Sequence, residues 1–211
     1  MKSVLLAAAI TAVGVPEAAG DAEGVLRKLE KAGRQLETMQ ARFLETRTLV
    51  LLDENEDSSG EVMLRVPGKL RWDYREPQPS VMLIADGHFA RYFPQTKQVF
   101  RGEARGEANL LVGFGPGAAG LGKKYEVTLV GDENVAGRPA HVLDLVPLTQ
   151  SSLFAEIRMW VDAERHFPVQ TRLTEPTGDY TTIRFEDVKI NAGLPGGAFE
   201  LKLPGDVVEV R

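Results

Sequence analysis

Apolar and polar residues alternate along much of this chain, most clearly from Gly60 to Phe93. On either side of a Pro67-Gly68 turn, every second residue is apolar or aromatic: Val62, Leu64, Val66, Leu70, Trp72 and Tyr74. A period of two is typical of antiparallel strands with one buried and one solvated face. Because the intervening Arg71 and Asp73 are costly to bury unpaired, we expect the face that carries Trp72 to point inward.

The same pattern predicts further strands before and after this region. A strand from Ala41 to Leu52 is followed by an acidic loop, Asp53 to Ser59, and an apolar run from Val81 to Ala85 ends at Asp86-Gly87, which suits a tight hairpin turn. Alternating or apolar segments then recur with turn residues between them: 125–129, 140–146, 157–161, 169–173, 180–190 and 199–203. About ten or eleven antiparallel strands result, which predicts a mainly β fold (α+β) with a strongly curved sheet.

Two segments are expected to cover the concave side of this sheet. Apolar residues recur at steps of three and four through the first of them: Val25, Leu26, Leu29, Ala32, Leu36, Met39 and Phe43. This spacing predicts a long amphipathic helix from Asp21 to about Phe43. The second is a short apolar segment with Leu110, Leu111 and Phe114, followed by glycine-rich residues. It is equally typical of a glycine-hinged lid and of a loop packed over the edge of a core.

Residues 1–20 differ in character from the rest of the chain. Lys2 precedes an apolar run from Val4 to Val15, and small residues follow up to Gly20. The run is too short to span a bilayer as a stable helix, so a secretory signal peptide is favoured over a membrane anchor or a buried N-terminal helix. We therefore expect residues 21–211 to form a single exported domain, soluble and located in the bacterial periplasm.

Composition and motifs exclude several kinds of site. The chain has no cysteine, which excludes disulfides and thiolate chemistry, and its net charge of −5 argues against nucleic acid as a partner. The three histidines, His88, His141 and His166, lack the spacing of metal ligands. A P-loop-like stretch at 117–124 lacks the hydroxyl that binds magnesium, and the acidic loop lacks the glycine and the bidentate acid of a calcium site. No catalytic residue, metal or cofactor is therefore predicted.

The apolar face itself is the remaining candidate for function. A curved sheet of this many strands offers more inward apolar area than one helix covers. The surplus indicates either a filled core or a cavity for a hydrophobic ligand, and the pattern alone favours the filled core because small closed barrels fill themselves with side chains.

Several strings in the chain resemble a known family. They are Phe43, then G-x-x-x-L-x-x-P-x-x-L-x-W-x-Y from Gly60 to Tyr74, Pro77, L-x-x-D-G from Leu83 to Gly87, Tyr92-Phe93, Gln98-Val99, Lys124-Tyr125, and F-x-L-x-x-P-x-x-V from Phe199 to Val207. With these strings the chain resembles the LolA family of periplasmic outer-membrane lipoprotein carriers. The resemblance implies an unclosed, eleven-stranded barrel lidded by helices. It also implies a monomer without enzymatic activity, which takes acylated lipoprotein from an inner-membrane transporter to an outer-membrane acceptor.

The resemblance also suggests where cargo is bound. The residues expected to line the apolar cavity are Leu64, Val66, Leu70, Trp72, Tyr74, Ile84 and Tyr92. This chain departs from the family at Val66, where well-studied members carry an arginine that fastens the lid by hydrogen bonds. Arg65 lies one residue earlier, and a shift of one residue in a strand turns the side chain to the other face. Our substitute hypothesis is an apolar lid contact made by Leu110, Leu111 and Phe114.

Three other functions remain open at this point. A carrier of the same fold for another lipid, such as a glycolipid, a polyene or a phospholipid, is credible because the family arginine is missing. A regulatory domain resembling RseB, which senses lipoprotein, is disfavoured because that family adds a second domain downstream and this chain ends at Arg211. An enzyme is disfavoured because no catalytic constellation is visible.

Overall fold

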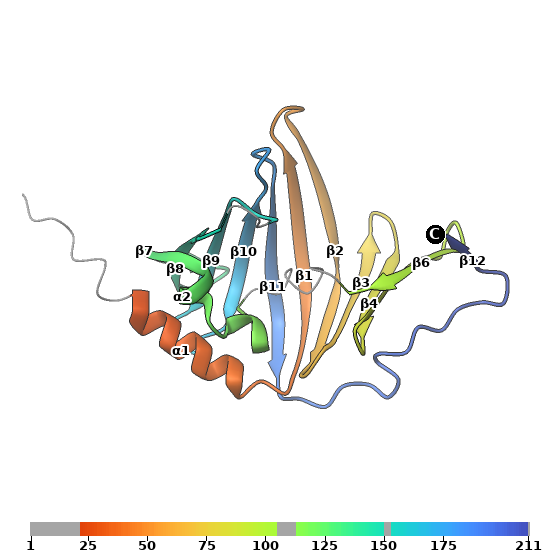
Figure 1. Ribbon diagram of the computed structural model, residues 1–211, viewed down its shortest axis with the longest axis horizontal. Helices are drawn as coiled ribbons and strands as arrows, with labels where there is room; N and C mark the ends of the chain where they lie inside the picture. Colours follow the sequence, from red (N-terminus) through yellow and green to blue (C-terminus); the bar gives the residue numbers. More distant parts are fainter. Residues whose placement is uncertain (1–21, 105–112, 150–152, 211) are drawn as a thin grey trace, which may run out of the picture.

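A computed structural model describes residues 22–104, 113–149 and 153–210. Most of them belong to one twelve-stranded sheet with the strand order β12-β6-β5-β4-β3-β2-β1-β11-β10-β9-β8-β7 (Figure 1). The helices are α1 (Ala22–Arg34), the 3-10 helix η2 (Gly115–Ala118) and α2 (Leu121–Lys124). The strands are β1 (Thr38–Leu49), β2 (Glu54–Arg65), β3 (Lys69–Glu76), β4 (Ser80–Ala85), β5 (His88–Phe93), β6 (Gln98–Glu103), β7 (Tyr125–Val135), β8 (Arg138–Pro147), β9 (Glu156–Asp162), β10 (Pro168–Thr174), β11 (Tyr180–Ile190) and β12 (Val208–Val210).

The predicted fold class is confirmed. The sheet is curved and unclosed, since β7 and β12 are its two edges, and an N-terminal helix packs beside it (Figure 1). At the C-terminal end of the chain, two details differ from the prediction. Residues 199–203 are not a strand, and β12 pairs in parallel with β6, whereas the other neighbouring strands of this sheet are antiparallel.

Helix α1 ends at Arg34, well before the predicted end near Phe43. The apolar residues Met39 and Phe43 are four positions apart, and this distance suits one face of a helix as well as one face of a strand. In the structure they lie on one face of β1 with Ala41 between them, and all of these side chains are buried. The helical pattern and the strand pattern therefore overlap at this junction, and sheet pairing decides between them.

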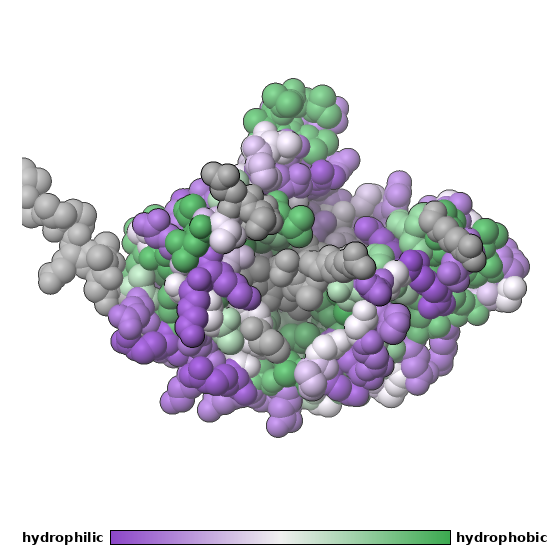
Figure 2. Space-filling view, viewed as in Figure 1, coloured by the Kyte–Doolittle hydropathy of each residue, from purple (hydrophilic) through white to green (hydrophobic). Residues whose placement is uncertain are grey.

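Strands β1 and β2 form a long hairpin that projects beyond the rest of the sheet (Figure 1). The predicted acidic loop is wrong, because most of it lies in β2, where Thr46 and Thr48 contact Asp57 and Asn55 across the ladder. The predicted strand residues Val50, Leu51 and Leu52 instead form the turn, and the Leu51 side chain is 89% exposed. Apolar surface is visible at this tip in Figure 2.

The face of the sheet against which α1, η2 and α2 pack is called the inner face here. Its core contains the largest fully buried side chains: Trp72, Phe43, Phe114, Leu29, Met39, Leu143, Leu145, Ile157, Met159, Leu173, Ile183 and Val62. Helix α1 contributes apolar side chains at the three- and four-residue steps seen in the sequence. None of the helices in the described ranges has the length and apolar character needed to cross a membrane.

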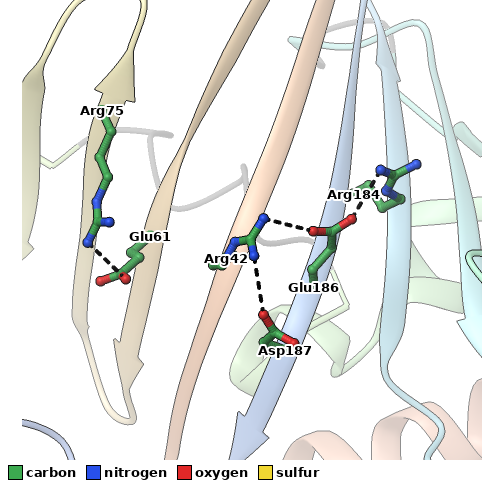
Figure 3. A network of polar contacts seen from close by, with 6 residues as sticks. All are labelled: Arg42, Glu61, Arg75, Arg184, Glu186 and Asp187. Carbon is green, nitrogen blue, oxygen red and sulfur yellow. Dashed lines mark hydrogen bonds and ion pairs between the residues drawn. The ribbon is translucent and has the colours of Figure 1, made fainter.

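The opposite, outer face is covered differently along the sheet. Over β2 to β6 lies the irregular C-terminal segment 191–207, and Arg71 donates hydrogen bonds to the carbonyl oxygens of Ala198 and Glu200 at 3.2 and 3.0 Å. Nearer the centre, the outer face carries ion pairs between neighbouring strands, such as Arg42 with Glu186 at 3.2 Å (Figure 3). Exposed pairs of this kind contribute little stability each, so they mark a solvated surface.

At Gly60 of β2, the core on the inner face leaves no room for a side chain. A Cβ atom at this position would lie 2.0 Å from the carbonyl oxygen of Asp73 and 2.8 Å from Cε1 of Phe43, which pairs with Gly60 in the ladder. We expect Gly60→Ala to lower the free energy of unfolding by about 2 kcal/mol, because overpacking forces neighbours apart. Chemical denaturation measures this. Gly102→Ala in β6 is the control, since its Cβ would meet nothing within 4 Å; equal stability of both variants would contradict the packing argument.

Candidate functional site

The centre of the inner face is filled by a cluster of aromatic rings. Phe43 packs edge-on against Trp72 with 4.6 Å between ring centroids, and Trp72 lies 6.4 Å from Phe185. Phe114 approaches from the covering side, with its ring 5.2 Å from that of Phe185, and is only 2% exposed. The sequence left open a filled core or a ligand cavity, and this part of the inner face is a filled core.

The structure brings most of the predicted cavity residues to the inner face. Leu64, Leu70, Trp72 and Ile84 are buried in the core, and Val66 and Tyr74 are half-buried against it. Tyr92 is the exception. It pairs with Val81 and Val99, whereas the inner-face residue Met82 pairs with Arg91, so Tyr92 lies on the outer face. There it lines a groove of about 410 Å³ beside the C-terminal segment.

The sequence could not settle the orientation of β5, because both faces of this strand carry an aromatic residue. Phe89, Arg91 and Phe93 are the residues of β5 that share the inner face with Met82. The half-buried rings of Phe89, Phe93 and Tyr74 and the more exposed ring of Phe100 form an aromatic surface, called the rim here. On the far half of the sheet, Tyr125, Val127 and Leu129 of β7 are likewise half-buried against the core.

Residues 113–124, which contain η2 and α2, form what is called the cover segment here. Phe114, Ala118 and Leu121 point into the core from it and are buried. Leu110 and Leu111, the other predicted lid residues, lie outside the described residues. Phe114 is the one predicted lid residue within the described ranges. Its ring also stacks on that of Phe167, with 6.1 Å between the ring centroids.

Val66 touches the cover segment where the family arginine would stand. A Cβ on Gly115 would lie 3.0 Å from Cγ2 of Val66, and Gly115 has a φ of +51°. A side chain at Gly115 would therefore be strained and would strike Val66. Arg65 faces the other way, as predicted, and its guanidinium lies 5.3 Å from the ring centroid of Phe199 in the C-terminal segment.

Helix α1 holds the cover segment through a close approach at Gly33. A Cβ on Gly33 would lie 2.7 Å from Cβ of Ala118 and 2.8 Å from the carbonyl oxygen of Gly115. One turn earlier, the Glu30 carboxylate accepts a hydrogen bond from the backbone N–H of Gly120 at 3.1 Å. The cover is thus attached by van der Waals contact and hydrogen bonding, both of which are reversible.

A polar group interrupts the apolar inner face beside the rim. The Tyr74 hydroxyl donates a hydrogen bond to Glu45 at 3.2 Å, and the Arg91 guanidinium lies 5.7 Å from the Tyr74 ring centroid and 5.1 Å from that of Phe93. Burial raises the pKa of the Glu45 carboxyl above its ordinary value, although the Tyr74 hydrogen bond and the charges of Arg91 and Arg47 act in the opposite direction. Burial and the neighbouring Glu45 also raise the pKa of the Tyr74 phenol, which therefore stays protonated as the donor.

The described residues contain no group of three or more histidines, aspartates or glutamates placed to hold a metal ion. His141 pairs with Asp132 at 2.6 Å, and His88 contacts the carbonyl oxygen of Asp86, so both have local partners.

Replacing Gly33 tests the attachment of the cover. Alanine is intrinsically favoured over glycine inside a helix by about 1 kcal/mol, so any loosening must come from the clash with Ala118 and Gly115. We expect Gly33→Ala to speed amide hydrogen exchange in residues 113–124, measured by mass spectrometry. Gly122→Ala is the control, because its Cβ would meet Leu26 at an ordinary 3.7 Å. Unchanged protection in Gly33→Ala would show that the contact does not hold the cover.

Replacing Glu45 tests the buried polar group. Because the folded-state pKa is raised, the folded wild type binds a proton that the unfolded chain has released, and its stability falls as pH rises above the ordinary value of 4.5. We expect Glu45→Gln to lose this decline, so that its stability relative to wild type improves from about pH 4 to about pH 8. Denaturant titrations at several pH values measure the difference. A constant difference, or one that moves the other way, would contradict the burial argument.

Comparisons with known proteins agree with this geometry. The family model described as "Outer membrane lipoprotein carrier protein LolA" matches residues 34–202. The outer-membrane lipoprotein carrier protein of Chromobacterium violaceum is 29% identical over 206 residues, which cover 97% of this chain and 94% of that protein. An uncharacterised conserved protein from Thermus thermophilus shares the fold at 14% identity with a TM-score of 0.60, covering 90% of this chain and 99% of that one.

A chain in the Pseudomonas aeruginosa MucA/MucB complex also has this fold, at 22% identity with a TM-score of 0.54. The match covers 86% of this chain but only 61% of that one. The family model matches most of the length of this chain, and the curved sheet and the covered inner face agree with that match. This chain therefore belongs to the LolA family of outer membrane lipoprotein carrier proteins.

Proposed function

We propose that this protein is a periplasmic carrier that shelters the acyl chains of lipoproteins against its inner face and moves them from the inner to the outer membrane. The observation that carries the proposal is the aromatic rim, of which Phe89 and Tyr74 pack against a core whose cover is attached by reversible contacts. Family membership and the carrier from Chromobacterium violaceum support the same function. No bond-making step is part of it.

The size of the hydrophobic effect explains why such cargo needs a carrier. Each methylene removed from water gains about 0.8 kcal/mol, so an acyl chain of membrane length gains on the order of 10 kcal/mol. In water such chains would aggregate or enter the wrong membrane. A carrier has to offer an apolar surface that is large enough to hold the chain. It also has to release the chain again at the acceptor.

The filled centre of the inner face implies that loading requires movement of the cover. Phe114 occupies the space between Phe167 and Phe185, so a chain that enters this part must displace it. Displacement exposes the Phe114 ring, and this cost offsets part of the gain from burying the acyl chain. A cover held by apolar packing at Val66 and Phe114, instead of an arginine lock, would make binding tight enough to protect the chain and weak enough to release it.

The remaining parts of the proposal follow the family. Residues 1–20 would be removed as a signal peptide, and residues 21–211 would act as a monomeric domain without cofactor. The donor would be an inner-membrane transporter and the acceptor an outer-membrane protein. A carrier for another lipid is the second candidate, and it is favoured by the positive charge of Arg91 on the inner face.

Matched aspartate substitutions test the proposal. Phe89 belongs to the rim and lies on the inner face of β5 opposite the buried Ile84, whereas Val146 of β8 points outward and is 47% exposed. We expect wild-type protein to bind a palmitoylated peptide at least about 100-fold more tightly than the same peptide without the chain. Phe89→Asp should weaken binding about tenfold or more, because it places a charge against the chain, and Val146→Asp should not.

Displacement of an environment-sensitive apolar dye measures these affinities, and mass spectrometry of lipids extracted from the exported protein identifies natural cargo. Equal affinity for the two peptides, or no binding of either, would overturn the carrier function.

A further inference from the structure

The inner face contains hydrogen-bond donors that have no partner in the described part of the chain. Nε1 of Trp72 and Nε of Arg91 are both buried atoms without a hydrogen-bond acceptor. A buried donor that is left unpaired lowers stability, so two of them on one face call for an explanation. They lie in the proposed cargo site, and this inference therefore rests on the proposed function.

These two donors lie on the inner face on the two strands that flank β4. Trp72 of β3 and Arg91 of β5 pair with the same residue, Met82 of the strand between them. Tyr74 is a neighbour of both, since its ring lies 6.2 Å from the Trp72 ring and 5.7 Å from the Arg91 guanidinium carbon. The sheet therefore places the Trp72 indole and the Arg91 guanidinium on either side of Met82, with the Tyr74 phenol near both, in one part of the wall next to the rim.

The chemistry of the groups limits what can satisfy them. Tryptophan and arginine side chains only donate hydrogen bonds, so the missing partner has to be an acceptor. Arginine is always charged and presents a planar fork of N–H groups that suits carboxylate and phosphate, which makes an anionic acceptor the best match. The rings of Tyr74 and Phe93 hold the guanidinium in place beside the apolar surface.

Glu45 is the alternative partner for Arg91 and has to be considered. Its carboxylate acts on Arg91 through space, but its described hydrogen bond is to the Tyr74 hydroxyl. Nε of Arg91 remains unpaired beside it. Glu45 therefore lowers the cost of burying the positive charge without using up the donors of the guanidinium.

We propose that the inner face binds acyl lipids that carry an oxyanion, with the carboxylate or phosphate held by Arg91, the Trp72 N–H as a second donor, and the chain lying along the rim. The site then selects charged lipids over neutral ones of the same chain length. This narrows the second candidate, a carrier for another lipid, to lipids with an anionic head close to the first methylenes, because the ester- and amide-linked chains of a lipoprotein lack such a head.

Three ligands with the same sixteen-carbon chain test this selection: palmitate, hexadecyl phosphate and hexadecanol. Binding is measured by dye displacement on the full protein, below the concentration at which each ligand forms micelles. We expect wild type to bind one or both anions about 10-fold to 100-fold more tightly than the alcohol, as a charge-assisted hydrogen bond in a buried site predicts. Comparison of the two anions identifies which head group is preferred, and inorganic phosphate without a chain should not compete.

Substitutions assign the selection to the site. Arg91→Gln should bring the anion-to-alcohol ratio close to one, and Trp72→Phe should reduce the ratio more modestly. Arg75→Gln is the matched control, because Arg75 lies on the outer face in an ion pair with Glu61 at 2.9 Å (Figure 3).

The outcomes separate this inference from the proposed function. Equal binding of the three ligands by wild type, or a preference for anions that survives in Arg91→Gln, would overturn the oxyanion site while the carrier function stands. If hexadecanol and both anions fail to bind, the carrier function itself fails. If Arg91→Gln lowers stability and leaves the ratio unchanged, Arg91 serves only as the counter-charge of Glu45.

Discussion

An open sheet that curves around an apolar face has to cover that face with something other than its own strands. In a closed barrel the strands surround the interior, but here β7 and β12 are free edges and the inner face is covered by α1 and residues 113–124. The packing of Phe43 on Trp72 above Gly60 builds the floor of this arrangement, and Phe114 docks onto the same cluster through Phe185. The positions of the helix, the cover and the rim all depend on that aromatic floor.

The two faces of the sheet are held by different kinds of interaction, and this difference suits a carrier. The outer face of β2 to β6 is tied to the C-terminal segment by hydrogen bonds from Arg71 to backbone carbonyl oxygens and by the stacking of Arg65 on Phe199. On the inner face the cover is held by the approach of Gly33 to Ala118, the contact of Gly115 with Val66 and one hydrogen bond to Glu30. Apolar contacts exchange readily for other apolar contacts, so under the proposed function an acyl chain would replace the cover at modest cost.

The polar group at Glu45, Tyr74 and Arg91 is unusual for a surface whose core is built mainly from apolar side chains. Burying these groups costs stability, as the raised pKa values of Glu45 and Tyr74 indicate. A purely apolar wall would hold any chain equally well, whereas a charge set in the wall distinguishes ligands by their heads. In a low-dielectric site one guanidinium is enough to make that distinction, because its interaction with an anion is poorly screened there.

The sequence by itself determined the mainly β class, the inward orientation of Trp72, the turn at Asp86-Gly87 and the turned-away position of Arg65, because each follows from local periodicity or turn chemistry. It did not determine where α1 ends, how far the β1–β2 hairpin extends, or which face of β5 is inner. Met39 and Phe43 fit either element, acidic residues are tolerated in a solvated hairpin, and β5 carries aromatic residues on both faces. Only pairing with neighbouring strands resolved these choices, because register sets the face of every side chain in a strand. That register placed Arg91 on the inner face and Tyr92 on the outer one.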